Sequence, residues 1–178
     1  MFYPDVKLSS YCVIAFIILF LHPVNAQVNG SPKVAIQVEL TTHLGNQPYF
    51  VAGDTYHLLV KLNQSAYLRL YYQNNAGPLL QIYPLSPLES GFHGPGYFFP
   101  LTSKKNTMTF KVTLPLGTEK FWLFACDKPL PLFKHRREPQ GFLLMSDPFV
   151  VLQQRIKRFA QNQCVKWGET YLHIETRL

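Results

Sequence analysis

The sequence lacks most of the motifs that enzymes use. Its 178 residues contain no Gly-x-Ser-x-Gly turn, no phosphate-binding loop and no dinucleotide-binding glycine pattern. The six histidines never recur at the HxH or HxxxH spacing that places two imidazoles on one face of a strand or helix. These absences argue against a serine hydrolase, against nucleotide chemistry and against a histidine-bound metal. We therefore expect a protein that is not an enzyme and that carries no cofactor or metal.

A membrane-spanning run is also missing. The apolar stretch from Tyr11 to Leu21 has 11 residues, whereas a helix needs about 20 to cross a bilayer. Lys7 precedes this stretch, and the small residues Val24 and Ala26 follow it. This arrangement is typical of a secretory signal cleaved after Ala26, and an uncleaved anchor is the alternative. We expect a periplasmic or extracellular protein with no transmembrane helix after cleavage.

Cysteine is scarce. Loss of the signal would leave two of the three cysteines, Cys126 and Cys164. In an exported protein this pair predicts one disulfide, which would stabilise the fold by about 3–4 kcal/mol in the chain-entropy model. Two buried free thiols are the alternative. Cys126 acting as a nucleophile beside His93 or His135 would instead make the protein a hydrolase.

Acidic residues are fewer than basic ones. The chain has 10 Asp and Glu against 17 Lys and Arg, a formal net charge of +7. The basic residues are densest at Lys134, Arg136 and Arg137. In an exported protein such charge attracts anionic polymers or a membrane surface, although solubility alone also explains it. Export makes nucleic acid an unexpected partner.

The chain is rich in β-strand patterning. Residues 66–84 alternate along two strands around a turn at Asn74–Gly77, which predicts a hairpin. Further strands are predicted at 34–42, 49–51, 56–62, 107–114 and 120–126. In the strand at 107–114 we expect Leu114 to face the core. The strand at 120–126 is apolar on both faces, which predicts a central position. Short strands at this spacing favour a small antiparallel, immunoglobulin-like β-sandwich.

The last third of the chain has a different pattern. Pro129, Pro131 and the basic cluster predict a linker, and residues 141–145 predict a strand. We expect Asp147 to cap a helix in which Pro148 is the first residue. Its apolar stripe comprises Phe149, Leu152, Ile156 and Phe159. Gly168 is expected to end the helix before a final strand through Thr170, Leu172 and Ile174.

The predicted organisation has three parts. Residues 1–26 form the signal, residues 27–130 form the sandwich, and residues 131–178 form a linker, helix and terminal strand packed on it. The candidate binding residues are aromatic. They are the hairpin tyrosines, with an alternative role in packing, and three residues of a long loop at 85–99: Tyr67, Tyr71, Tyr72, Tyr83, Phe92, Tyr97 and Phe98.

An ordered series of small motifs covers residues 49–130. The motifs are Gly53-Asp54, Tyr67-Leu68, Gly77, Leu80 with Tyr83-Pro84, Gly96, Pro100, Phe110-Lys111-Val112, Pro115, Gly117, Glu119, Phe124-Ala125 and Pro129-Leu130. In this order they resemble the bacterial domain-of-unknown-function family numbered 4384. The resemblance implies a compact β-sandwich in exported or envelope-associated proteins. It implies no activity and no catalytic residues.

These observations favour a non-catalytic, exported protein-interaction module whose partner is an unknown envelope protein. The alternative is a module that binds glycan or anionic polymer through the tyrosines and the basic cluster. A hydrolase using Cys126 and a histidine is the second alternative.

Overall fold

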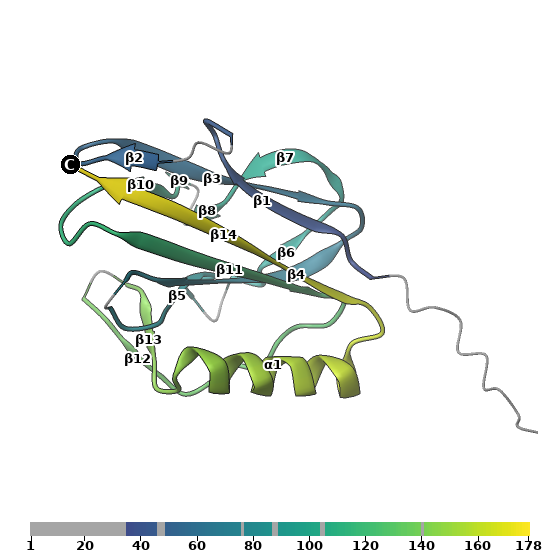
Figure 1. The fold of residues 1–178 in the computed structure, drawn as a ribbon. Coiled ribbons are helices and arrows are strands. Elements are labelled where there is room, and N and C mark those ends of the chain that lie inside the picture. Colours follow the sequence, from purple (N-terminus) through teal and green to yellow (C-terminus); the bar gives the residue numbers. More distant parts are fainter. Residues whose placement is uncertain (1–34, 46–48, 76, 87–88, 104–105, 140) are drawn as a thin grey trace, which may run out of the picture. The chain divides into compact units, whose positions relative to one another are not determined.

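Two β-sheets face each other, and one helix lies on the outer face of the second sheet (Figure 1). The computed structural model describes residues 35–45, 49–75, 77–86, 89–103, 106–139 and 141–178. The expected signal segment therefore lies outside the described residues. The described residues are mainly β, with one helix near the C-terminus and a final strand, as the sequence predicts.

The first sheet is built around β3 (Thr55–Leu62). One face of β3 buries Tyr56, Leu58, Val60 and Leu62, as its alternation predicts. All pairings with β3 are antiparallel. β10 pairs with the first part of β3, and β7 pairs with its last part. Its partners are β1 (Val38–Thr42), β7 (Gly96–Pro100) and β10 (Thr109–Lys111).

The second sheet has the order β12-β13-β5-β4-β11-β14-β2, with β6 also paired to β4. Its predicted β4–β5 hairpin is present, and β14 pairs with β2 in parallel. A separate pair joins β8 (Thr102–Ser103) to β9 (Asn106–Thr107). The strands of the second sheet are β2 (Tyr49–Val51), β4 (Ala66–Gln73), β5 (Leu80–Tyr83), β6 (Phe92–His93), β11 (Thr118–Cys126), β12 (His135–Arg137), β13 (Leu143–Met145) and β14 (Trp167–Arg177).

Strand β11 separates two hydrophobic cores. It lies between β4 and β14, which confirms the predicted central position. Phe121 and Leu123 belong to the core between the two sheets. Trp122 and Phe124 belong to a second core beneath the helix. Both faces of β11 are buried because each faces another layer, which explains why its sequence is apolar throughout.

The single described helix, α1 (Phe149–Gln163), covers the outer face of the second sheet (Figure 1). Leu152, Ile156 and Ala160 are fully buried against that sheet. Both predicted helix boundaries are wrong. Pro148 itself is the N-cap, and Asp147 forms an ion pair with Arg155 instead of capping the helix. The helix ends at Gln163, because the next residue is already extended.

Four other expectations are corrected. Gly168 lies inside β14 and does not end the helix. The expected loop at 85–99 contains β6 and the start of β7, whose backbones pair with the ends of β4 and β3. Leu114 is 75% exposed, because β10 ends at Lys111 and the inward alternation stops at the buried Val112. The expected linker includes β12, which pairs with β13.

Strands from the last third complete the second sheet. β12, β13 and β14 all hydrogen-bond within the sheet that contains β4 and β11.

Within the described part of the chain, no helix is both long and apolar enough to cross a membrane.

Candidate functional site

The four hairpin tyrosines do not share one exposed face. Tyr71 and Tyr83 are buried, and Tyr67 and Tyr72 are half-buried. Tyr71 packs in the core beneath the helix, whereas Tyr72 and Tyr83 pack in or against the core between the sheets. Adjacent residues of a strand point to opposite faces. These side chains therefore contribute mainly to packing.

Three aromatic side chains of β6 and β7 remain exposed. Phe92 is 51% exposed, Tyr97 is 94% exposed and Phe98 is 42% exposed. We call these three residues the aromatic edge. The Phe92 ring centroid lies 5.1 Å from that of Tyr67, and the Lys61 ammonium lies 5.6 Å from the centroid of Phe98. Pairing of β6 with β4 and of β7 with β3 anchors this surface to both sheets.

The basic cluster is partly engaged by the rest of the chain. Lys134 is exposed. Arg136 forms an ion pair with Glu138 at 2.9 Å, and Arg137 donates a hydrogen bond to the Leu85 carbonyl at 3.1 Å. Exposed ion pairs of this kind contribute little stability, but they reduce the net charge available to a polymer.

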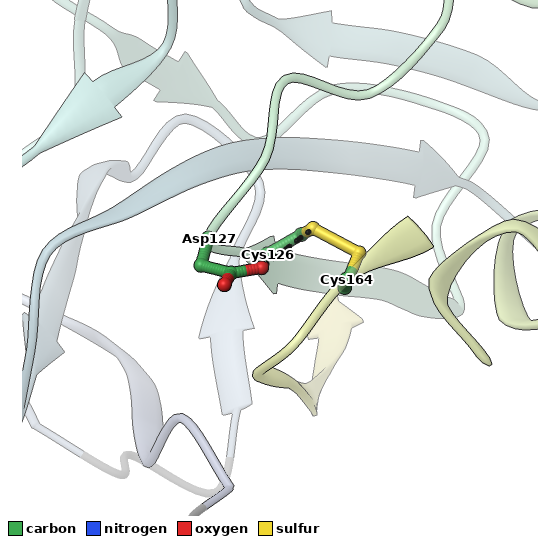
Figure 2. A group of neighbouring side chains, drawn as sticks. All are labelled: Cys126, Asp127 and Cys164. Atoms are coloured by element: carbon green, nitrogen blue, oxygen red, sulfur yellow. Dashed lines mark hydrogen bonds between the residues drawn. A yellow bond between two sulfur atoms is a disulfide. The ribbon is translucent and has the colours of Figure 1, made fainter. Parts of the chain in front are cut away.

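Cys126 and Cys164 form a disulfide between the end of β11 and the end of α1 (Figure 2). Asp127 brings a carboxylate beside the two sulfurs, and their potential ligand atoms lie within 4.8 Å of one another. The sulfurs are bonded to each other, so they are not thiolate ligands. For the same reason Cys126 is not available as a nucleophile in this state.

The two histidines considered as bases have other partners. His93 shares a 2.6 Å hydrogen bond with the hydroxyl of Tyr83. Burial lowers the pKa of His93. The Nδ1 atom of His135 lies 2.8 Å from the carbonyl oxygen of Phe133.

A cleft of about 240 Å³ opens over Arg69 on the outer face of the second sheet. Arg69 is only 9% exposed. Its guanidinium donates to Gln81 Oε1 at 3.1 Å and to the Leu130 carbonyl at 2.6 Å. We call this space the Arg69 cleft. Its lining comprises Tyr67, Leu68, Arg69, Gln81, Pro84, Ser86, Glu89, Ser90, Pro129, Leu130, Leu132 and Leu143.

A second polar cluster lies at the mouth of the space between the two sheets. The Tyr56 hydroxyl donates to Glu119 at 2.5 Å. Burial raises the pKa of Glu119, while the Tyr56 hydrogen bond opposes that rise. Burial and the nearby Glu119 charge raise the pKa of Tyr72 to about 12. The adjoining pocket has a volume of only about 120 Å³, which suits water better than a ligand of ordinary size.

An apolar pocket of about 300 Å³ lies beside the N-terminal end of α1. Trp122 lines this pocket and stacks on Tyr71, with ring centroids 5.2 Å apart. The Tyr71 hydroxyl is buried close to the Arg69 guanidinium. Burial raises the pKa of Tyr71 to about 12, although the charge of Arg69 and a hydrogen bond with Arg69 oppose that rise. Lys120 and His173 supply polar atoms to the lining.

The comparisons with known proteins find a match to one family model. Residues 49–129 match the model of the family described as domain of unknown function (DUF4384). This confirms the resemblance read from the ordered motifs. The match covers 81 of 178 residues, from β2 to just beyond β11. No curated protein and no solved structure matches the chain.

The Arg69 cleft combines the DUF4384 segment with the chain that follows it. Arg69 and Gln81 lie inside the matched residues, whereas Leu130, Leu132 and Leu143 lie beyond them. Sequence reasoning missed this cleft. One feature of the sequence could have indicated it: Arg69 lies between Leu68 and Leu70 in a predicted strand, where a charged side chain is unusual. In the structure all three of these residues are buried.

Proposed function

We propose that this protein is a non-catalytic, exported interaction module that binds another protein of the cell envelope. The observation that carries the proposal is the aromatic edge, in which Phe92, Tyr97 and Phe98 are 51%, 94% and 42% exposed. Aromatic side chains are enriched in protein interfaces, because they bury much apolar area with few rotatable bonds. The Cys126–Cys164 disulfide supports export, since such bonds persist mainly outside the cytoplasm.

The anchoring of the aromatic edge supports a preorganised contact. Backbone pairing holds both of its strands, so binding does not require a loop to become ordered. Lys61 beside Phe98 also offers a polar group at the margin of the surface. A hydrophobic centre with a polar rim is the common arrangement of protein interfaces.

The test is capture of partners from the envelope fraction of the source organism by the tagged protein. The variants are Tyr97→Ser/Phe98→Ser and, as a matched control, Tyr49→Ser. Tyr49 is 46% exposed and lies on β2, away from the pairings of β6 and β7. We expect one stoichiometric protein that survives high salt, is lost with the double variant and is kept with the control.

Two results would contradict the proposal. One is a partner retained equally by the double variant. The other is capture of polymer or lipid alone with loss at high salt, because screening weakens charge attraction but not apolar burial. The second result would favour the basic cluster and an anionic-polymer module.

A further inference from the structure

We propose that the Arg69 cleft binds the carboxylate group of an apolar acid. The acid is either a free small molecule or the C-terminus of a peptide, since both present the same chemistry. This inference does not depend on the aromatic edge. It rests on a buried cation, its hydrogen bonds and the lining of the space above it.

Arg69 has no carboxylate partner among the described residues. No Asp or Glu oxygen of those residues lies within the 4.0 Å of an ion pair with its guanidinium. The Gln81 amide and the Leu130 carbonyl, which accept its hydrogen bonds at 3.1 and 2.6 Å, are neutral, and so is the nearby Tyr71 hydroxyl. Arginine stays charged at all physiological pH values. The fold therefore holds a positive charge in a largely buried position without a neutralising contact.

A bound carboxylate would remove this imbalance. Leaving a buried charge unpaired is unfavourable, so a ligand that supplies the opposite charge recovers part of that cost. The two neutral acceptors use two of the five N–H groups of a guanidinium. The planar guanidinium matches a carboxylate with two parallel hydrogen bonds. The positive charge of Arg69, its burial and the open cleft beside it together favour binding of an anion.

The lining selects an apolar monocarboxylate over phosphate. Leu130, Leu132 and Leu143 form apolar walls. Glu89 also lines the cleft, with its carboxylate accepting a hydrogen bond from the Leu85 amide at 3.2 Å. The Glu89 carboxylate repels any anion, and it repels a doubly charged phosphate more strongly than a singly charged carboxylate. The volume of about 240 Å³ suits a small acid or one terminal side chain.

The test is an NMR titration of the ¹⁵N-labelled protein with 4-methylpentanoate and, as a matched neutral probe, 4-methylpentanamide. We expect the acid to give saturable shifts at the Arg69 side-chain N–H and the Gln81 amide, with a Kd of about 1 mM. The amide should leave those signals unshifted. Acetyl-Ala-Leu as free acid and as amide forms the peptide arm. Tighter binding of the peptide acid than of 4-methylpentanoate indicates a chain terminus, and weaker binding indicates a small acid.

Three variants separate binding from folding. Arg69→Gln should weaken binding of the acid by about tenfold or more. Because Arg69 also holds the Leu130 carbonyl, Leu132→Trp provides a second test: it blocks the cleft from its exposed rim and keeps the arginine. Arg136→Gln is the control, since it removes an exposed cation and should leave binding unchanged.

The inference fails if the acid causes no saturable shift at about 10 mM. It also fails if the amide shifts the same signals equally, or if Leu132→Trp binds the acid as the native protein does. In each case Arg69 would serve only to hold the Leu130 carbonyl and the Gln81 side chain.

Discussion

Single residues at the sheet interface carry chemistry that strand alternation alone does not reveal. Glu119 lies at the start of β11, and its carboxylate accepts a hydrogen bond from Tyr56 of the opposite sheet. Gly168 lies in β14, where the carbonyl of Ile36 approaches its Cα closely. Each contact joins chain segments more than 60 residues apart. We therefore expect substitution of either residue to change the free energy of unfolding.

The raised pKa of Glu119 predicts a pH dependence of stability. Burial raises this pKa above its usual 4.5, so the native state holds the proton at pH values where the unfolded chain has lost it. The contribution of Glu119 to the free energy of unfolding is therefore full below pH 4.5 and falls as the pH rises through the native pKa. We expect Glu119→Gln to flatten this fall, measured by urea denaturation at a series of pH values.

The control for Glu119 is Glu39→Gln, which removes an exposed carboxylate paired with Lys61 at 3.1 Å. It should leave the slope in the same pH window unchanged. Equal slopes in the native protein and Glu119→Gln would show that Glu119 does not titrate differently in the two states.

Gly168 predicts a steric limit. A Cβ at this position would lie 1.8 Å from the Ile36 carbonyl oxygen, a backbone atom that cannot swing aside. We expect Gly168→Ala to lower the free energy of unfolding by about 1–3 kcal/mol or more, the usual range for overpacking. Gly94→Ala is the matched control, because nothing lies within 4 Å of its Cβ. Chemical denaturation of both variants checks this, and equal midpoints would contradict it.

At the scale of elements, α1 is the cover of the second core. Its buried residues contact the outer side of β11 and β4, where Trp122, Phe124 and Tyr71 lie. Its opposite side exposes Val150 and Val151. Isolated helices of this length are marginal in water, so packing on the sheet is what stabilises α1.

This packing predicts a large difference between the two sides of the helix. Ile156 is fully buried, and Ile156→Ala should cost about 2–5 kcal/mol through lost burial and an unfilled cavity. Val150 is 60% exposed, and Val150→Ala should change the free energy of unfolding by less than about 0.5 kcal/mol. Thermal or chemical denaturation measures both. Similar losses would mean that the helix is not docked through Ile156.

At the scale of the whole molecule, the disulfide ties the end of the helix to the end of the central strand. Cys126 and Cys164 are 38 residues apart in sequence, and the loop between them includes β12, β13 and α1. The bond restricts the unfolded chain over this entire segment. In the native state it holds the C-terminal end of α1 to the sheet that this helix covers.

The disulfide predicts a redox-dependent stability. Closing a loop of this length contributes about 4 kcal/mol in the chain-entropy model. We expect a thiol reductant to lower the unfolding midpoint of the native protein. Cys126→Ala/Cys164→Ala should have a similarly lowered midpoint that the reductant leaves unchanged. A reductant effect in the double variant, or none in the native protein under conditions that reduce the bond, would contradict this account.

Local patterns predicted the elements better than their ends. The alternation in β3 and the two apolar faces of β11 are visible in sequence, because strand periodicity follows directly from backbone geometry. The helix stripe was visible for the same reason. Its start was misplaced by one residue, because Asp147 pairs with Arg155 of the helix instead of capping it.

The sequence by itself determined the mainly β class, the hairpin, the paired cysteines and the family resemblance, since each depends on residues close together or on their order. Only the tertiary structure decided which aromatics stay exposed. Tyr71 and Tyr97 are the same residue type, yet one is buried by a helix that follows some 80 residues later and the other is not. The Arg69 cleft arises in the same way, because its walls come from strands and loops that meet only when the sheets are assembled. Burial is a property of the neighbours that folding supplies, and those neighbours are distant in sequence.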